Sequence, residues 1–110
     1  MIEEALGSLI DRFNRRVDRT PAVREELQGL SRSIALKLSD GTSYMVDLRD
    51  SHLRNLRPGT NGHADVTITT DAATFLGLVA KEIGPMKALV TRKLSIDGSL
   101  EDKLLFRKLL

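Results

Sequence analysis

The dipeptide Asp40-Gly41 constrains the fold of this 110-residue chain more than any other feature of its sequence. It lies between two segments, 33–38 and 44–49, in which apolar and polar residues alternate. Alternation with period two is typical of a half-buried strand, and Asp-Gly between two such segments strongly favours a hairpin. The sequence therefore predicts an antiparallel strand pair with one buried face. That face would hold Ile34, Leu36, Leu38, Tyr44, Val46 and Leu48.

Two helices are expected ahead of this hairpin. Apolar residues recur at three- and four-residue steps across 2–17, which is typical of an amphipathic helix. Thr20-Pro21 then offers a cap followed by proline at the first helical position. A short second helix should begin there, and Gly29 can close it.

The middle of the chain predicts two further strands and two helices. Residues 51–57 are expected to form an irregular strand that ends at Pro58-Gly59, and 64–70 to form a regular strand. Thr70 or Asp71 can cap a helix over about 72–82. A short helix should follow Gly84-Pro85.

The last eighteen residues complete the expected fold. Residues 93–96 are expected to form a strand, and Gly98 is expected to form a tight turn. Ser99 and Asp102 can form a capping box that starts a terminal helix. Short antiparallel strands with helices before and after them indicate an α+β fold, a single domain over residues 1–110, with the helices on one face of the sheet.

The composition excludes most kinds of reactive site. The chain has no cysteine, which excludes disulfides, thiolate metal sites and a cysteine nucleophile. Neither His52 nor His63 has a second metal ligand at a helical or strand spacing, and no phosphate-binding glycine loop is present. We therefore expect no catalytic residue, no metal and no cofactor, and we expect that the protein is not an enzyme.

Binding to nucleic acid is not expected either. The net charge is only +2, and aromatic residues make up 4% of the chain. Arg12, Arg15, Arg16 and Arg19 gather on one flank of the first helix, where they form either a plain solvated face or a weak attraction for anionic lipid head-groups. Glu3 and Glu4 stand where a signal peptide would carry positive charge, and the longest apolar run, at positions 75–80, is too short to span a membrane. Both features favour a cytoplasmic protein over a secreted or membrane-spanning one.

Residues 72–110 hold more aliphatic side chains than one helix face can use. A helix that is apolar on two sides must contact two things. One is the sheet, and the other is a second helix, a partner chain such as a second copy, or a bound apolar ligand. Spacing alone favours ordinary core or dimer packing over a ligand tunnel.

The order of these parts resembles the sterol carrier protein 2 (SCP-2-like) family. The resemblance rests on "LSDGTSYMVDLRD" and on "ADVTITTDAATFLGLVAKEIGPMKALVTRKLSIDGSLEDKLLFRKLL", and covers roughly residues 33–110. Asp65 to Ile68, Phe75, Pro85, Lys93 to Ile96 and Gly98 match the family pattern. Two departures stand out: Arg92 takes the place of a small residue, and "SHLRNLRPGTNG" is a poor match for the usual strand.

The resemblance implies a five-stranded, mostly antiparallel sheet with helices packed on one face, enclosing an apolar tunnel. It implies an intracellular carrier or presenter of a lipid (fatty acid, fatty acyl-CoA, isoprenoid or sterol-like) without catalytic residues. The alternative is an SCP2-like accessory or scaffold protein that binds a partner enzyme through its apolar helix faces. The expected lipid-binding residues are Val66, Ile68, Phe75, Leu78, Val79, Ile83, Met86, Leu89, Val90, Leu94, Ile96, Leu105 and Leu109.

Overall fold

The computed structural model describes residues 2–59 and 62–109, with side chains described as far as Arg107. Its five strands form one sheet in the order β3-β2-β1-β4-β5. The strands are β1 (Arg32–Leu38), β2 (Ser43–Arg49), β3 (His52–Pro58), β4 (Val66–Thr70) and β5 (Leu94–Asp97). Only the central pair, β1 with β4, is parallel, and the other three pairs are antiparallel. The sheet is thus mostly antiparallel, as predicted.

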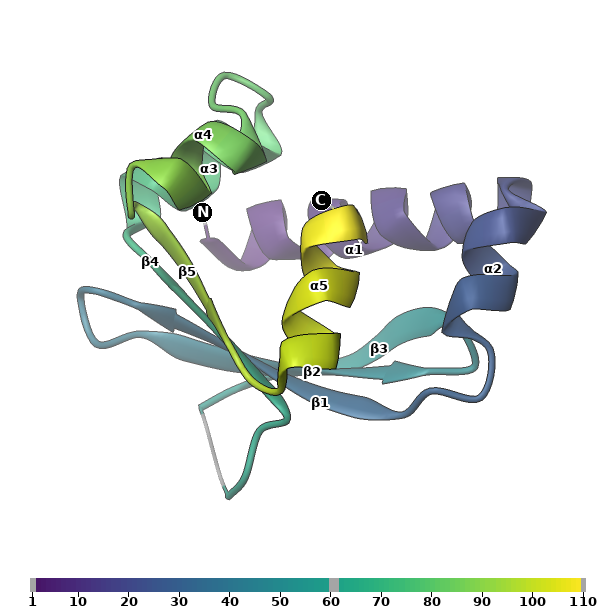
Figure 1. The fold of residues 1–110 in the computed structure, drawn as a ribbon. Helices are drawn as coiled ribbons and strands as arrows, with labels where there is room; N and C mark the ends of the chain where they lie inside the picture. The colour runs from purple at the N-terminus through teal and green to yellow at the C-terminus, as the bar shows by residue number, and fades with distance from the viewer. Residues whose placement is uncertain (1, 60–61, 110) are drawn as a thin grey trace.

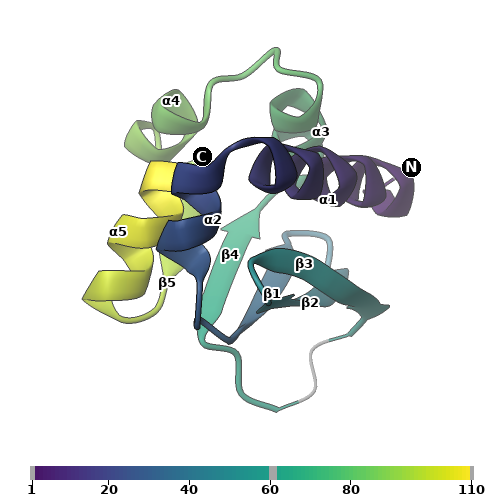
Figure 2. The same cartoon turned by 90° about the vertical axis from the view of Figure 1, so that its right-hand side faces the viewer.

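The helices all lie over one face of this sheet (Figure 1). They are α1 (Ile2–Arg19), α2 (Pro21–Leu27), α3 (Ala72–Val79), α4 (Pro85–Val90) and α5 (Leu100–Leu109). In the perpendicular view α1 crosses above the sheet, with α3 and α4 on one side of it and α2 and α5 on another (Figure 2). The predicted α+β architecture is confirmed. No helix among the described residues is long and apolar enough to cross a membrane.

The core lies between α1 and the sheet. Leu6, Ile10 and Val17 on α1 are buried against side chains of β1 and β2. The β1–β2 register pairs Leu36 with Tyr44 across the predicted Asp40-Gly41 hairpin. The 3.6-residue period of α1 and the period of two in β1 therefore meet in one aliphatic layer.

The expectation of a single buried face on this strand pair is wrong. Ala35, Met45 and Asp47 are also buried, on the face that carries no helix. Side chains from β3 cover Asp47: Asn55 Nδ2 and Arg57 Nη2 donate to its carboxylate at 3.0 and 3.3 Å. Burial alone would raise the pKa of Asp47, but these two donors together hold it below its ordinary value.

Two helix ends also differ from expectation. Helix α3 ends at Val79, not near 82, because Lys81 takes a left-handed conformation (φ 61°) that a continuing helix excludes. At its start the Asp71 carboxylate accepts a hydrogen bond from the Thr74 amide at 2.7 Å, so Asp71 is the cap. Thr20 occupies the cap position of α2, but its side chain makes no capping bond.

Candidate functional site

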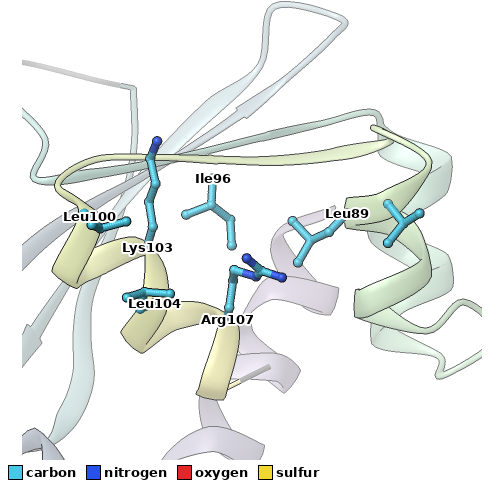
Figure 3. Close-up of a pocket in the computed structure, with 7 residues that line it drawn as sticks. Leu89, Ile96, Leu100, Lys103, Leu104 and Arg107 are labelled. Carbon is cyan, nitrogen blue, oxygen red and sulfur yellow. The ribbon is translucent and has the colours of Figure 1, made fainter.

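An apolar groove lies between α4, the edge strand β5 and α5 (Figure 3). Its volume is about 400 Å³, and it is open to solvent along one side. Leu89 of α4 lies on one wall, and Ile96 of β5 forms the floor. Val90, the last residue of α4, also lines the groove. The opposite wall is the side of α5 that carries Leu100, Lys103, Leu104 and Arg107.

The chain reversal after α4 brings β5 alongside this helix. Arg92 adopts a left-handed conformation (φ 62°) directly after the helix, and the Lys93 amide donates to the Ala88 carbonyl at 2.9 Å. Strand β5 then pairs with β4, with Ile96 opposite Ile68. Because alternate residues of a strand face the same side, Leu94 and Ile96 both point toward the helices, Leu94 into the core and Ile96 into the groove.

Two contacts fix the start of α5 against the sheet. Gly98 (φ 153°) lets the chain turn so close to β4 that a Cβ atom at this position would lie 2.8 Å from the Asp65 carbonyl oxygen. Arg32 Nε, at the start of β1, donates to both carboxylate oxygens of Asp102 at 3.0 and 3.1 Å. Asp102 is buried, so this ion pair holds the first turn of α5 in place.

The capping box expected at this point is half formed. The Asp102 amide donates to Ser99 Oγ at 3.1 Å, as predicted. The Asp102 carboxylate binds Arg32 and does not return to Ser99. Asp102 therefore holds α5 against β1 through Arg32, and it does not make the second hydrogen bond of a capping box.

Helix α5 presents different stripes to the core and to the groove. Leu105 and Phe106 pack against the core. Leu100 and Leu104, one turn apart, are exposed at the groove. Lys103 and Arg107 are likewise one turn apart, so the groove wall alternates aliphatic and cationic side chains.

The groove can hold an apolar chain and attract an anionic end. Among the described residues that line it, the ionisable side chains are Lys103 and Arg107, both cationic. No group of three or more potential metal ligands occurs in the described part of the chain.

The structure brings three of the thirteen expected lipid-binding residues together at this groove, namely Leu89, Val90 and Ile96. The others lie elsewhere. Val66, Phe75 and Leu94 are buried core residues, and Ile68, Val79 and Leu105 pack partly buried against them. Leu78 and Ile83 are half-buried, and Met86 is exposed on α4. Leu109 ends α5, and its side chain is outside the described residues.

The sequence prediction missed four lining residues: Leu100, Lys103, Leu104 and Arg107. A signal for them was present, because each pair repeats at four residues and so shares one helix face. The spacing does not reveal which apolar stripe of a helix faces the core, so the expected set contains Leu105 and not Leu104.

An α+β fold with an apolar groove open to solvent is suited to a small domain that binds an apolar ligand. The model of the SCP-2 sterol transfer family matches residues 10–110, so the chain belongs to that family, as the sequence resemblance indicated. Membership implies lipid binding or transfer. No curated protein matches the chain.

Solved structures show the same fold. A crystal structure of sterol carrier protein 2 is 19% identical, with a TM-score of 0.64 over 91% of this chain and 88% of that one. Palmitated SCP2L2 from Aedes aegypti is 24% identical, with a TM-score of 0.57 over 89% and 88% of the two chains. The inverting sec-alkylsulfatase Pisa1 from Pseudomonas sp. is 22% identical, with a TM-score of 0.59 over 79% of this chain. The present chain spans only 14% of that sulfatase.

Proposed function

We propose that this protein binds the acyl chain of a lipid in the groove between α4, β5 and α5, as a carrier or presenter without catalytic activity. The observation that supports this function is the chemistry of the groove. Aliphatic side chains lie on every wall, and the described lining residues include two cations and no acid–base pair. Its volume of about 400 Å³ is within the ~300–1,000 Å³ usual for ligand sites. A cytoplasmic location stays a prediction from the sequence.

Aliphatic walls suffice for a carrier on energetic grounds. Removing an acyl chain from water is worth roughly 0.8 kcal/mol per methylene group. A bilayer offers the lipid nearly the same gain, so a carrier needs comparable burial and few specific polar contacts. Among the candidate ligands, Lys103 and Arg107 favour those with an anionic end, a fatty acid or a fatty acyl-CoA.

Titration with a fluorescent fatty acid tests this function. We expect saturable binding of one ligand per chain, competition by unlabelled palmitate, and weaker binding by Leu104→Asp, which places a carboxylate in the groove wall. Absence of saturable binding across several acyl lengths, by protein shown to be folded, would contradict the proposal. Native mass spectrometry of the freshly purified protein would identify any lipid that it retains.

A second candidate is an accessory domain that binds an enzyme. The observation that favours it is the strong exposure of Val90 and Leu100, which line the groove and leave apolar surface available to a partner chain. A similar fold occupies a small part of the sec-alkylsulfatase chain. Co-purification of a stoichiometric protein partner, with no lipid bound before or after its removal, would favour this second function.

A further inference from the structure

The exposed apolar side chains are concentrated around the mouth of the groove. Of the six large apolar residues that are exposed in the described part of the chain, four lie on α4 and α5: Met86 (51% exposed), Val90 (77%), Leu100 (73%) and Leu104 (55%). Val90, Leu100 and Leu104 line the groove, and Met86 lies one turn before Val90 on α4. We call these four residues the groove rim.

The charge of the protein is concentrated in the same region. Residues 85–107 hold five basic and three acidic side chains, and the rest of the chain holds twelve of each. The whole net charge of +2 therefore belongs to the segment that builds the rim. One of its three acids, Asp102, is buried in the ion pair with Arg32, so the exposed surface of the segment is more positive still.

Helix α1, where the sequence suggested an attraction for lipid head-groups, lacks this combination. It carries four acidic residues beside its four arginines, so it has no net charge. Arg12 Nη2 donates to the Val79 carbonyl at 2.7 Å, which draws that arginine inward to the end of α3. The apolar stripe of α1 faces the core, with Leu6, Ile10 and Val17 buried.

We propose that the groove rim is the surface by which the protein docks on an anionic lipid bilayer. Surfaces that combine exposed aliphatic side chains with Lys and Arg bind such interfaces through both shallow insertion and attraction to the head-groups. Lys87 and Arg92 are exposed on and just after α4, and Arg107 lies beside Leu104 on α5. Because the groove opens at the rim, a bilayer held there faces the groove directly. Passage of a lipid across this contact rests on the proposed function, whereas the docking itself does not.

Charge favours a bilayer over a second copy of the chain as the occupant of the rim. Two copies joined through their rims would bring two positively charged segments together, which is unfavourable. An anionic bilayer complements that charge. A dimer remains a distinct outcome of the test.

Co-sedimentation with vesicles of phosphatidylcholine, with or without phosphatidylglycerol, tests the docking. The ligand-free protein should bind only the vesicles that contain phosphatidylglycerol, and added salt should release it. Lys87→Gln with Arg92→Gln removes two exposed cations that lie beside the groove rim and do not line the groove. Since each cation near an anionic surface contributes about fivefold, the partition coefficient should fall about 25-fold. Met86→Gln should also weaken binding, by removing an inserted side chain.

Arg15→Gln with Arg19→Gln is the matched control, because it removes the same charge from the exposed side of α1 and should change partition by less than about twofold. An equal loss in both double variants, a loss in the α1 variant alone, or failure of the wild type to bind would overturn the proposal. So would a stable dimer in sedimentation that Met86→Gln dissociates. Fatty-acid binding by Lys87→Gln/Arg92→Gln should be unchanged, so that failure to dock and failure of the groove are told apart.

Discussion

His52 Nε2 lies 2.7 Å from the Asp18 Oδ1 atom, and this contact joins the first residue of β3 to the end of α1. The other ring nitrogen, Nδ1, lies 2.7 Å from the Asp50 carbonyl oxygen. Both neighbours are acceptors, so the ring satisfies both only when it is protonated and donates from each nitrogen. The hydrogen bond with Asp18, followed by that with Asp50, raises the pKa of His52 above its ordinary value of 6.5, against smaller opposing effects of burial and Arg54.

The free energy of unfolding should therefore depend on pH through His52. A raised pKa in the folded state means that the stabilisation is fully present below the unfolded value of 6.5 and is lost as pH rises through the folded pKa. We expect the stability difference between wild type and His52→Gln to be larger near pH 6 than near pH 8.5, measured by urea unfolding. NMR titration of Asp18→Asn should show a lower His52 pKa. A difference that does not change with pH would contradict this role.

The ion pair between Arg32 and Asp102 should stabilise both the fold and the groove wall. Replacing Arg32 with Met leaves a buried carboxylate without its donor, which typically costs about 1–3 kcal/mol. Urea unfolding measures this loss, and amide exchange should show earlier opening of α5. Arg54→Met is the matched control, since Arg54 lies 3.8 Å from an exposed Asp50 carboxylate and should contribute little. Equal losses in the two variants would contradict the assigned role of Asp102.

A substitution of Arg92 by glycine should stabilise the protein. Arg92 has φ 62°, a conformation that costs a residue with a Cβ atom roughly 1–2 kcal/mol and glycine nothing. The greater freedom of glycine in the unfolded chain offsets about 0.5–1 kcal/mol of this gain. Thermal unfolding should show a net gain of about 0.5–1 kcal/mol for Arg92→Gly, and little change for Arg92→Ala. A loss of stability in Arg92→Gly would mean that the arginine side chain matters more than the backbone.

The same backbone angle explains one departure of the sequence from the family pattern. Where that pattern has a small residue, this chain has Arg92, yet it turns there as a glycine would. The other departure falls in β3, where Asn55 takes φ 61° and the pairing with β2 shifts register between Met45 and Asp47. The segment is a strand, as predicted, and its irregularity is a bulge.

Local patterns predicted the elements well because each one depends on near neighbours. Alternation around Asp40-Gly41 predicted β1 and β2, and Asp71 capped α3 as expected. The groove could not be predicted in this way, since it depends on how α5 is rotated against β5. That rotation follows from a contact between residues 70 positions apart, Arg32 and Asp102. Neither a helical period nor a capping motif carries this information.

Leu89→Trp should separate an open groove from a packed core. Leu89 is half-buried on the groove wall, so an indole at this position can occupy the space left for a ligand. We expect acyl-chain binding to be abolished and the thermal midpoint of the ligand-free protein to be level or raised. Overpacking of a filled core would instead cost about 1–3 kcal/mol. Leu56→Trp, at an exposed position on β3, is the control and should leave binding intact.

The most direct test of the groove as the lipid site is paramagnetic NMR with a fatty acid that carries a nitroxide on its acyl chain. Bound in the groove, the nitroxide should broaden the methyl signals of Leu89, Ile96 and Leu104, and excess unlabelled palmitate should restore them. Methyl groups on β3, at the edge of the sheet opposite β5, such as those of Leu56, should be broadened far less. Broadening centred on the core between α1 and the sheet, with sharp signals from Leu89 and Leu104, would contradict the central claim.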